Sequence, residues 1–384
     1  TLTGTGAGNY TLDKTALTGI GTIARRALTL GAVAAQTKTY DGTTAADASQ
    51  FHATLNNVVA GEENLVAATA AGAAYNDKNV AGANRIDYTG IALTGTGAAN
   101  YTVADTAQGA GTITKRALTL GEVTAQTKTY DGTRAADTSK FRVALGNVVT
   151  GEENSVTATA ADASYNDKNV VQANAVSYTG VSLTGTGAGN YSIVNTAQGT
   201  GTIAKRTLTV GAVTAQSKTY DGTTAADTAT FRATLDNVVA GEESSVTATA
   251  TGAAYNDKTV AGANKVNYTG VALTGAGAGN YIVANTAEGA GTITKRALTL
   301  GAVAAQTKIY DGTTIADASK FRAALNNVVA GDNVTAAAAT ATFNDKNVAA
   351  ANRIDYTGVA LAGAGAGNYT LAATMAQGAG TITP

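Results

Sequence analysis

The chain has 384 residues, of which 26 are basic and 27 acidic, and its pI is near 5.9. This balanced charge gives no electrostatic case for binding nucleic acid or an anionic membrane surface. No apolar run approaches the roughly 20 residues that cross a bilayer, so we expect no membrane span. The chain has no Cys and a single His, which excludes thiol nucleophiles, histidine-based triads and the usual zinc sites.

A seven-residue motif, KTYDGTT at residues 38–44, returns with a spacing of 90 residues. Solenoid repeats run about 20 to 50 residues, whereas a self-contained sandwich domain needs about 100, so each copy is expected to be a domain. A second motif, NDK, and a third, Asn-Tyr after a glycine-rich run, follow in the same order. The residues that we single out as the repeat signature are Lys38, Tyr40, Asp41, Gly42, Asn76, Asp77, Lys78, Tyr101, Lys128, Tyr130, Asp131, Gly132, Lys218, Tyr220, Asp221, Gly222, Lys308, Tyr310, Asp311 and Gly312.

Basic residue pairs mark the start of each copy. Cutting the chain there predicts four repeats, at residues 25–114, 115–204, 205–294 and 295–384. Residues 1–24 match the end of a copy, and we interpret them as the C-terminal fragment of a preceding repeat. The fourth copy lacks two residues between its first two motifs.

Within the first copy, apolar and polar residues alternate in short runs that turn signals interrupt. Tyr40 precedes an Asp-Gly turn and is expected to pack inward. Lys38 shares its face, so its stem should lie along the core edge with the ammonium in water. In chain order we expect strands at 27–33, 37–40, 51–59 (a strand pair or one bent strand), 65–75, 85–93, 101–103 and 111–114, a short helical turn at 45–50, and turns at 76–79 and 95–100.

About seven short strands per copy predict an all-β fold, a tandem array of antiparallel β-sandwich modules. Residues 111–114 run directly into the next copy, and the apolar face switches between Ile113 and Leu118. One extended segment should therefore leave one core and enter the next. No linker rich in Gly, Ser or Pro separates the copies, so we expect the modules to form a semi-rigid, elongated rod.

The KxYDGTT motif, the later NDKNVA segment and the terminal GNYT and TIT runs resemble the YDG repeat. The resemblance covers all four copies and also the leading fragment, which supplies GAGNYT at residues 6–11. It implies Ig-like β-sandwich modules arrayed in large secreted adhesins and haemagglutinin-like proteins of Gram-negative bacteria, and hence an extracellular location at the bacterial surface. Arg134 and Phe343 depart from the pattern of the other copies, without breaking the module.

Catalytic chemistry finds little support in the sequence. All 16 Tyr and five Phe fall at positions that recur between copies, which favours core roles. His52 is replaced by Arg at the matching positions 142, 232 and 322, so a solvent-facing role is expected. The GTGAGN loops precede strands rather than a helix, which does not fit a phosphate-binding loop. We expect no enzymatic activity and no cofactor.

Some of the recurring charged and amide residues also suit two further kinds of site, a calcium site and an isopeptide bond. Calcium could be held by Asp41, Glu62, Glu63 and Asp77 with their equivalents, although no D-x-D-x-D-G loop is present. A self-catalysed isopeptide bond could join a Lys to an Asn or Asp, and Lys38, Lys78, Asn76, Asp77 and Asp41 supply these residue types. The side chains of both sets also suit turn capping and solvation.

We therefore predict a non-enzymatic stalk or spacer segment of a bacterial adhesin or extracellular fibre, with roles in cell adhesion and biofilm matrix. Its expected partners are the adjacent repeats, other copies of itself in a fibre, and a host or glycan receptor. One alternative is a filament subunit that joins its neighbours by strand addition through residues 1–24. Another is a carbohydrate- or receptor-binding repeat that uses exposed Tyr and Asn.

Overall fold

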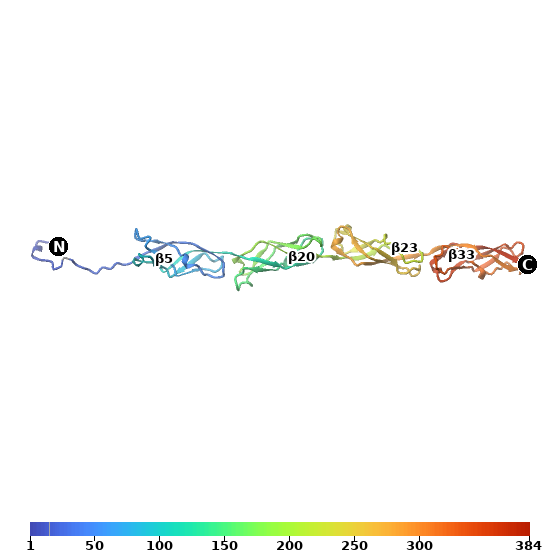
Figure 1. The fold of residues 1–384 in the computed structure, drawn as a ribbon, viewed down its shortest axis with the longest axis horizontal. Helices are drawn as coiled ribbons and strands as arrows, with labels where there is room; N and C mark the ends of the chain where they lie inside the picture. Colours follow the sequence, from blue (N-terminus) through green and yellow to red (C-terminus); the bar gives the residue numbers. More distant parts are fainter. Residues whose placement is uncertain (15) are drawn as a thin grey trace. The chain divides into compact units, whose positions relative to one another are not determined.

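A computed structural model describes residues 1–14 and 16–384 of the chain (Figure 1). Strands and short 3-10 helices make up its regular structure, and no α-helix occurs in this described part. The chain divides into two compact units. The first contains Thr1–Gln126, Ala135–Tyr165 and Ala175–Gly201, and the second contains Thr127–Arg134, Asn166–Asn174 and Thr202–Pro384.

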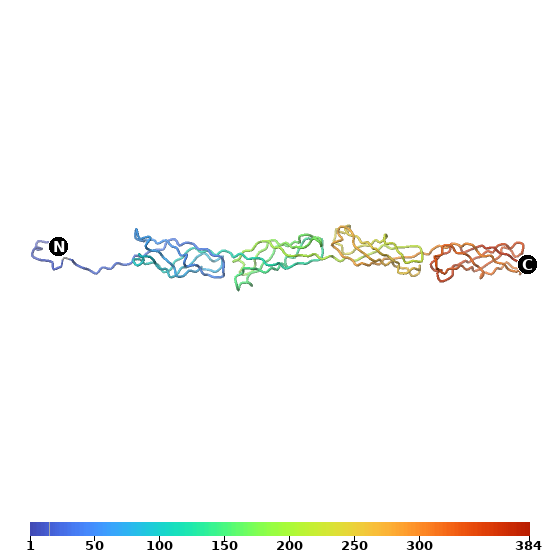
Figure 2. Tube along the Cα trace, viewed as in Figure 1, coloured from blue at the N-terminus to red at the C-terminus, as the bar shows by residue number. Residues whose placement is uncertain are grey.

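The leading segment carries one 3-10 helix, η1 (Ala7–Asn9), and none of its described residues forms a strand. In Figure 2 the trace curls at the N-terminus, and residues 16–24 run as an extended segment. Its large apolar side chains at Leu17, Ile20 and Ile23 are fully exposed to solvent. The segment therefore contributes no described side chain to the buried core.

The first repeat contains ten short strands and two 3-10 helices, all within the first unit. Their bounds are β1 (Arg26–Ala27), β2 (Thr29–Val33), β3 (Gln36–Thr39), η2 (Ala48–Gln50), β4 (Ala53–Asn56), β5 (Ala67–Thr69), β6 (Gly72–Tyr75), β7 (Arg85–Thr89), β8 (Ala92–Thr94), η3 (Ala98–Asn100), β9 (Tyr101–Thr102) and β10 (Thr106–Thr114). The predicted helical turn at 45–50 is present as η2, which the Asp47 carboxylate caps by accepting from the Ser49 amide.

One layer of the repeat is a four-stranded sheet in the order β3-β10-β7-β6. Its central strand, β10, pairs antiparallel with β7 and parallel with β3. Gly111 on β10 is required by the packing, because a Cβ there would lie 2.7 Å from Ile86 Cγ1 and 2.9 Å from Tyr75 Cε1. The aromatic core thus closes directly over the backbone of the central strand.

The facing layer consists of the pairs β2-β4, β5-β8 and β1-β9. The pair β1-β9 is parallel, whereas the other two are antiparallel. The packing between layers is close over small residues, since a Cβ on Gly109 of β10 would lie 3.0 Å from Val33 Cγ1 of β2. The predicted β-sandwich is confirmed, but it is not wholly antiparallel and contains more strands than the seven expected.

The longer expected strands are divided because local geometry interrupts them. Gly90 adopts φ +65° between β7 and β8, a conformation that suits glycine. Leu28 separates β1 from β2, whereas the matching residues of the fourth repeat belong to one strand. Short bulged or turned segments of this kind carry no strong sequence signal beyond the glycines themselves.

The other three repeats use the same order of elements. In the second these are β11 (Arg116–Ala117), β12 (Thr119–Val123), β13 (Gln126–Thr129), η4 (Thr138–Lys140), β14 (Val143–Gly146), β15 (Thr157–Thr159), β16 (Asp162–Tyr165), β17 (Ala175–Thr179), β18 (Ser182–Thr184), η5 (Ala188–Asn190), β19 (Tyr191–Ser192) and β20 (Thr196–Ala204). In the third these are β21 (Arg206–Thr207), β22 (Thr209–Val213), β23 (Gln216–Thr219), β24 (Ala233–Asp236), η6 (Glu243–Ser245), β25 (Thr247–Thr249), β26 (Gly252–Tyr255), β27 (Lys265–Thr269), β28 (Ala272–Thr274), η7 (Ala278–Asn280), β29 (Tyr281–Ile282) and β30 (Thr286–Thr294). In the fourth these are β31 (Arg296–Val303), β32 (Gln306–Ile309), η8 (Ala318–Lys320), β33 (Ala323–Asn326), β34 (Thr335–Ala337), β35 (Thr340–Phe343), β36 (Arg353–Thr357), β37 (Ala360–Ala362), η9 (Ala366–Asn368), β38 (Tyr369–Leu371) and β39 (Met375–Thr383).

The core of each repeat is built from recurring aromatic and aliphatic residues. In the first repeat Phe51 packs on Tyr88 with ring centroids 4.7 Å apart, and the Tyr88 hydroxyl accepts from the buried Gln36 amide at 2.8 Å. This core cluster also contains Leu118, Val156 and Tyr191, which belong to the second repeat. Two consecutive repeats of the first unit thus share one continuous apolar cluster.

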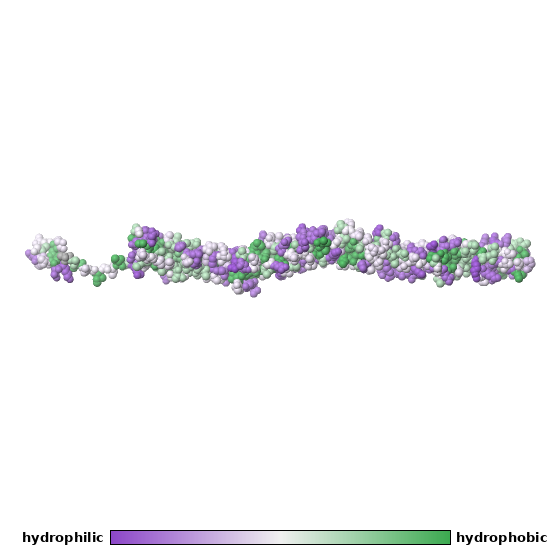
Figure 3. Space-filling model, viewed as in Figure 1, coloured by the Kyte–Doolittle hydropathy of each residue, from purple (hydrophilic) through white to green (hydrophobic). Residues whose placement is uncertain are grey.

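The surface of the repeats is mixed in polarity. On the face drawn in Figure 3, hydrophilic and hydrophobic residues are interspersed over each repeat. None of the helices in residues 1–14 and 16–384 has the length and apolar character needed to cross a membrane.

Candidate functional site: the joint between repeats

The signature tyrosine lies at the end of its repeat and contacts the next repeat. Tyr40 follows β3, and its amide donates to the Thr114 carbonyl at the end of β10. Its side chain is only 1% exposed. We call the end of a repeat that carries this tyrosine the tip, defined in the first repeat by Tyr40, Gly42, Asn79 and Val80.

The tip of the first repeat contacts a set of residues on the side of the second repeat that faces it. We call this set the acceptor face, defined there by Val149, Glu152, Asn190 and Tyr191, and we call the contact between a tip and an acceptor face the joint. Gly42 adopts φ +79°, and a Cβ on it would lie 3.0 Å from Val149 Cγ1. The glycine of the motif therefore serves both the turn and the close approach of the next repeat.

A carboxylate shared by two tyrosines forms the centre of the joint. The Tyr40 hydroxyl donates to Glu152 Oε1 at 2.6 Å, and the Tyr191 hydroxyl donates to Glu152 Oε2 at 2.7 Å. The two rings pack edge to face, with centroids 5.4 Å apart and an interplanar angle of 82°. Hydrogen bonds to an ionised acceptor are roughly twice as strong as neutral ones, so this arrangement fixes both rings.

A reciprocal pair of amide contacts forms a second clasp across the same joint. The Val80 amide donates to Asn190 Oδ1 at 2.9 Å, and Asn190 Nδ2 donates to Asn79 Oδ1 at 2.9 Å. Asn190 is buried. The NDKNV turn, which carries Asn79 and Val80, is thereby held at the joint together with the YDG turn.

The second unit contains the same joint twice. Tyr130 and Tyr281 both donate to Glu242, at 2.7 Å each, and their ring centroids are 5.3 Å apart. Tyr220 and Tyr369 both donate to Asp332, at 2.9 and 2.6 Å, again with centroids 5.3 Å apart. The joint is thus a repeated structure and not a feature of one pair of repeats.

The shortened loop of the fourth repeat lies in its acceptor face. The third repeat has the sequence GEES at residues 241–244, where the fourth repeat has GDNV at residues 331–334. The 3-10 helix η6 of the third repeat has no counterpart in this loop of the fourth. Asp332 nevertheless reaches both tyrosines with the same oxygen, Oδ2. The fourth repeat thus combines a shorter loop with aspartate in place of glutamate, and its carboxylate still binds both tyrosines.

The electrostatics of the joint favour an ionised acid between two neutral phenols. Burial raises the pKa of Tyr40, and the hydrogen bond to the Glu152 carboxylate raises it further. In the second unit burial and Asp332 raise the pKa of Tyr220 to about 12. Burial alone would raise the pKa of Glu152, but the bonds from Tyr40 and Tyr191 outweigh it and hold that pKa below its usual value.

The signature lysine and aspartate form a network inside their own tip. Lys38 Nζ donates to Asp41 Oδ1 at 2.8 Å and to the carbonyls of Thr43 and Ala45 at 2.8 and 2.9 Å. Its ammonium also lies 5.3 Å from the centroid of the Tyr75 ring. The expectation that this ammonium extends into water is wrong, because these three acceptors and the Thr43 hydroxyl bind it and hold the turn that presents Tyr40.

The NDK residues close the neighbouring turn. The Asn76 side chain donates to the Gly82 carbonyl and accepts from the Asn84 and Arg85 amides. The Asp77 carboxylate accepts from the Asn79 amide at 2.7 Å. Lys78 lies near Glu152 of the next repeat, where its charge helps to lower the pKa of that acid.

The residues considered for an isopeptide bond fall into separate networks. Lys38 is paired with Asp41, whose side chain is 46% exposed, whereas Asn76 is engaged with backbone groups of its own turn. The lysine and asparagine are therefore not placed as reaction partners. Mass spectrometry of the intact chain checks this directly, since each bond to Asn would remove one ammonia.

The carboxylates considered for calcium are also dispersed. Asp41 is paired with Lys38, Asp77 with the Asn79 amide, Glu62 with the Tyr101 hydroxyl and Glu63 with the Gly61 amide. No group of three or more potential metal-ligating side chains occurs among residues 1–14 and 16–384. The acidic residues thus act as hydrogen-bond acceptors for their own turns and tyrosines.

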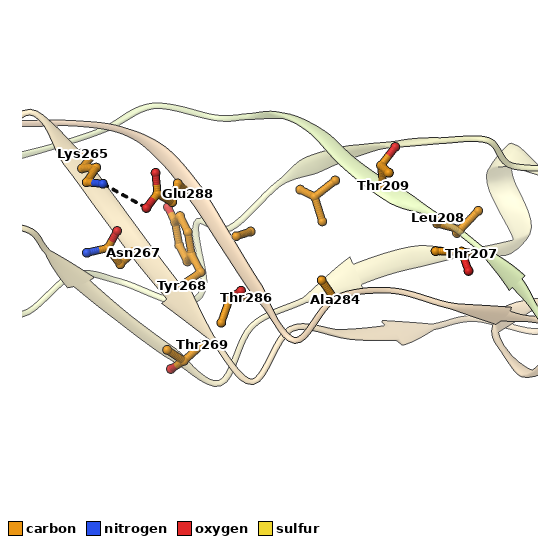
Figure 4. Close-up of a pocket in the computed structure, with 12 residues that line it drawn as sticks. Thr207, Leu208, Thr209, Lys265, Asn267, Tyr268, Thr269, Ala284, Thr286 and Glu288 are labelled. Atoms are coloured by element: carbon orange, nitrogen blue, oxygen red, sulfur yellow. Dashed lines mark hydrogen bonds and ion pairs between the residues drawn. The ribbon is translucent and has the colours of Figure 1, made fainter.

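A hollow of about 830 Å³ lies on the side of the third repeat (Figure 4). Thr207, Thr209, Asn267 and Thr286 contribute short polar side chains to it, while Lys265 and Glu288 pair with each other at 2.9 Å. Its aromatic residue, Tyr268, is 1% exposed, and its hydroxyl accepts a hydrogen bond from Gln216 Nε2. The arrangement offers neither an activated nucleophile nor an exposed aromatic platform. His52 is exposed and lies outside this hollow, in the first repeat.

The acceptor glutamate is the functional residue that the sequence did not single out for this role. Glu152 and Glu153 are adjacent in a polar turn, and only the first reaches the tyrosines, while the second accepts from the Gly151 amide. A usable signal was the recurrence of an acid at 62, 152, 242 and 332. Each of these acids accepts a hydrogen bond from the tyrosine that follows the glycine-rich run.

Solved structures of other tandem β-domain proteins are similar in outline. They include the human desmocollin-1 ectodomain (7% identity, covering 92% of this chain and 79% of that chain, TM-score 0.26). They also include Sidekick-1 immunoglobulin domains 1–5 (9%, 92% and 80%, TM-score 0.26) and Drosophila N-cadherin EC1-4 (9%, 93% and 99%, TM-score 0.24). At these values the likeness carries no argument about this chain.

The family comparison is more specific. No curated protein matches the chain. The YDG domain matches it four times in tandem, at residues 24–108, 114–199, 204–288 and 294–376. Since these matches cover most of the sequence, the chain belongs to the YDG domain family.

Proposed function

We propose that this chain is a non-enzymatic stalk or spacer segment of a bacterial surface adhesin or extracellular fibre. The chain is a tandem array of four β-sandwich repeats of the YDG domain family. The observation that carries the proposal is the joint, in which two buried tyrosines share one carboxylate at each of three successive contacts.

The joint supports a spacer role because it restricts bending without a linker. A hinge between domains usually lies where few contacts cross and the linker is polar and flexible. Here β10 ends at Thr114 and β11 begins at Arg116, so one residue separates the strands of consecutive repeats. The tyrosine pair, the carboxylate and the asparagine clasp all lie around that point.

Small-angle X-ray scattering of the intact chain tests the proposal. We expect an extended, stiff scattering profile whose maximum dimension falls when Glu152, Glu242 and Asp332 are all replaced by Ala. A profile typical of flexibly linked domains, unchanged by these substitutions, would contradict a stiff spacer. Detection of the native protein on the outside of intact cells tests the proposed location.

Strand addition by the leading segment is the second candidate, and one observation bears on it. Residues 19–24 match the end of β10, the central strand of a repeat, and the apolar side chains at Ile20 and Ile23 are exposed. Each of the four repeats already contains its own strand at this position, namely β10, β20, β30 or β39. Filaments that persist after deletion of residues 1–24 would exclude this route.

A glycan- or receptor-binding role is the remaining candidate. The recurring tyrosines at 40, 88, 130, 178 and 191 are almost fully buried and are bonded inside the fold, which removes most of the aromatic surface that such a role would use. A glycan array probed with the four-repeat chain tests this role. Binding that increases with the number of repeats would support it.

A further inference from the structure

The chain enters and leaves the third repeat at opposite ends, and the whole of this repeat belongs to the second unit. β21 begins at Arg206 and pairs with β29, whose Tyr281 lies in the acceptor face. β30 ends at Thr294, whose carbonyl accepts from the amide of Tyr220 in the tip. The strands run along the long axis of the repeat (Figure 1). The preceding chain is thus joined to the acceptor face, and the following chain is joined to the tip.

The start of the repeat is fastened at the acceptor face by a reciprocal clasp. Arg206 Nε donates to the Asn237 carbonyl at 2.7 Å, and Arg206 Nη2 donates to Asn237 Oδ1 at 2.6 Å. In return, Asn237 Nδ2 donates to the Thr207 carbonyl at 2.9 Å. In the second repeat Arg116 and Asn147 are joined in the same way. A pull on the preceding chain therefore meets a fixed point at this arginine.

From the clasp the chain runs to the tip in a nearly continuous extended stretch. β21, β22 and β23 follow one another with gaps of one and two residues. In the fourth repeat the residues that match β21 and β22 form a single strand, β31. Tyr220 of the tip comes directly after β23. We call residues 206–219 the entry segment, and it spans the repeat from the acceptor face to the tip.

The end of the entry segment pairs directly with the last strand of the repeat. β23 and β30 are parallel, with Cα partners from Gln216 opposite Gly291 to Thr219 opposite Thr294. At the tip the Tyr220 amide donates to the Thr294 carbonyl at 2.9 Å, and the Thr294 hydroxyl donates to the Lys218 carbonyl at 3.2 Å. The first and fourth repeats have the same parallel pairing, of β3 with β10 and of β32 with β39.

Tension along the chain loads this ladder in shear. A pull on the preceding chain draws the entry segment toward the acceptor face, whereas a pull on the following chain draws β30 toward the tip. Because β23 and β30 are parallel neighbours, the two pulls act in opposite directions along the strand axis. The bonds of a parallel pair are evenly spaced, so they carry this load together. A pull that separates the two strands from one end would instead break the bonds one at a time.

The other strand pairs of the third repeat do not join its two ends directly. The pairs β21-β29 and β22-β24 contain strands of the entry segment without β30, and the pair β27-β30 contains β30 without the entry segment. The pairs β25-β28 and β26-β27 contain neither. The ladder of β23 with β30 is thus the direct link between the two points at which tension acts.

We propose that the repeats bear tension between the ends of the chain, and that the parallel ladder of β23 with β30 is the element that resists it. The matching ladders of β3 with β10 and of β32 with β39 have the same role. Forced unfolding is governed by the unfolding rate and not by equilibrium stability, so one ladder can set the resistance of a whole repeat. The inference goes beyond the spacer function, which concerns length and stiffness, and its failure would leave the expected scattering result unchanged.

Optical tweezers applied to the intact chain test the proposal through the direction of pulling. The chain has no Cys, so two introduced cysteines give defined attachment points for DNA handles. Lys205→Cys with Lys295→Cys pulls the third repeat from its two ends and loads the ladder in shear. Thr224→Cys with Lys295→Cys pulls at the tip alone and separates β23 from β30 pair by pair. All three positions are exposed. We expect a several-fold higher unfolding force in the first arrangement, and equal forces would overturn the proposal.

A matched pair of proline variants, made in the chain that carries Lys205→Cys and Lys295→Cys, locates the resistance. Thr292→Pro lies in β30 opposite Ser217 and disrupts the ladder, whereas Thr274→Pro lies in β28 opposite Thr247, outside the ladder. Both should lower the midpoint of thermal unfolding, but the unfolding force should fall only in Thr292→Pro. Equal losses of force in the two variants, or no loss in Thr292→Pro, would overturn the proposal. The comparison of pulling directions needs no destabilising substitution, so it decides the question even where a proline variant fails to fold.

Discussion

Tyr40 donates a hydrogen bond to Glu152, a residue 112 positions further along the chain, and the same acid accepts from Tyr191. The contact explains why an apparently local motif recurs in every repeat. The lysine, aspartate and glycine shape a turn, and the turn presents a tyrosine to the following repeat.

Removing one acceptor acid should loosen one joint selectively. In Glu242→Ala, the hydroxyls of Tyr130 and Tyr281 lose a charged acceptor, and unsatisfied buried polar groups cost about 1–3 kcal/mol each. We expect faster amide hydrogen exchange around residues 130 and 281, measured by mass spectrometry on the intact chain. Glu243→Ala is the control, because Glu243 accepts from the Gly241 amide in its own turn; equal effects of the two variants would contradict the role assigned to Glu242.

The joints should weaken in acid. The folded pKa of Glu152 and of Glu242 lies below the ordinary glutamate value of 4.5. A lowered folded pKa contributes stability that is complete above the ordinary value and is lost as the pH falls through the folded one. Hydrogen exchange at the joint peptides should therefore accelerate, after correction for intrinsic rates, when the pH falls below 4.5, while exchange in β7 and β10 changes less.

The same joints should weaken in alkali, for the opposite reason. Burial and Asp332 raise the pKa of Tyr220 from 10.0 to about 12. A raised folded pKa contributes stability that is complete below the ordinary value and is lost as the pH rises through the folded one. Titration of the tyrosines followed by ultraviolet absorbance should show a set of side chains that ionise only above pH 10. Tyr220→Phe should remove one tyrosine from that set.

Two tyrosines in the third repeat should respond differently to loss of the hydroxyl. The Tyr255 hydroxyl is buried without a hydrogen-bond partner among the residues that the structure describes, and the fourth repeat carries Phe343 at this position. Tyr255→Phe should be neutral or slightly stabilising in denaturant unfolding. Tyr268→Phe should cost about 1 kcal/mol or more, because the Tyr268 hydroxyl is bonded to Gln216 at 2.7 Å. A larger loss from Tyr255→Phe would show that its hydroxyl has a partner.

Glycines on the central strand should be intolerant of alanine. A Cβ on Gly291 of β30 would lie 2.7 Å from Val266 Cγ2 and 3.0 Å from Tyr255 Cε1. Overpacking of this kind typically costs about 1–3 kcal/mol, so Gly291→Ala should lower the midpoint of thermal unfolding. Gly279→Ala is the control, since no atom lies within 4 Å of its added Cβ; a comparable loss there would mean that backbone entropy, and not packing, sets the effect.

Much of the module could be predicted from the sequence because its signals are local. Alternation around Tyr88 and Ile86 placed β7, and the Asp-Gly turn ended β3 as expected, whereas the division of the expected strand 85–93 at Gly90 was not predicted. The parallel pairing of β3 with β10 could not be predicted in this way, since the two strands are separated by most of the repeat. Strand periodicity reports which face a side chain occupies, but not which strand lies beside it.

At the candidate site, too, the sequence predicted some features and not others. Tyr40 was expected to be buried, and it is, but its burial depends on the next repeat, as the exposed Tyr310 shows. Lys38 was expected to reach water and instead bonds to the tip that it shares with Asp41. An alternating pattern identifies a side chain that is buried, but it does not indicate which repeat contributes the residues that bury it.

The sequence by itself determined the period, the all-β class of the repeated module and the identity of the recurring residues, because each is a property of neighbouring positions. Only the tertiary structure decided that Glu152, and not the adjacent Glu153, joins Tyr40 to Tyr191. The two acids are chemically alike in a polar turn. Which of the two acids accepts the tyrosine hydrogen bonds depends on where three loops that are distant in sequence meet in space. A local sequence pattern does not contain the positions of these loops.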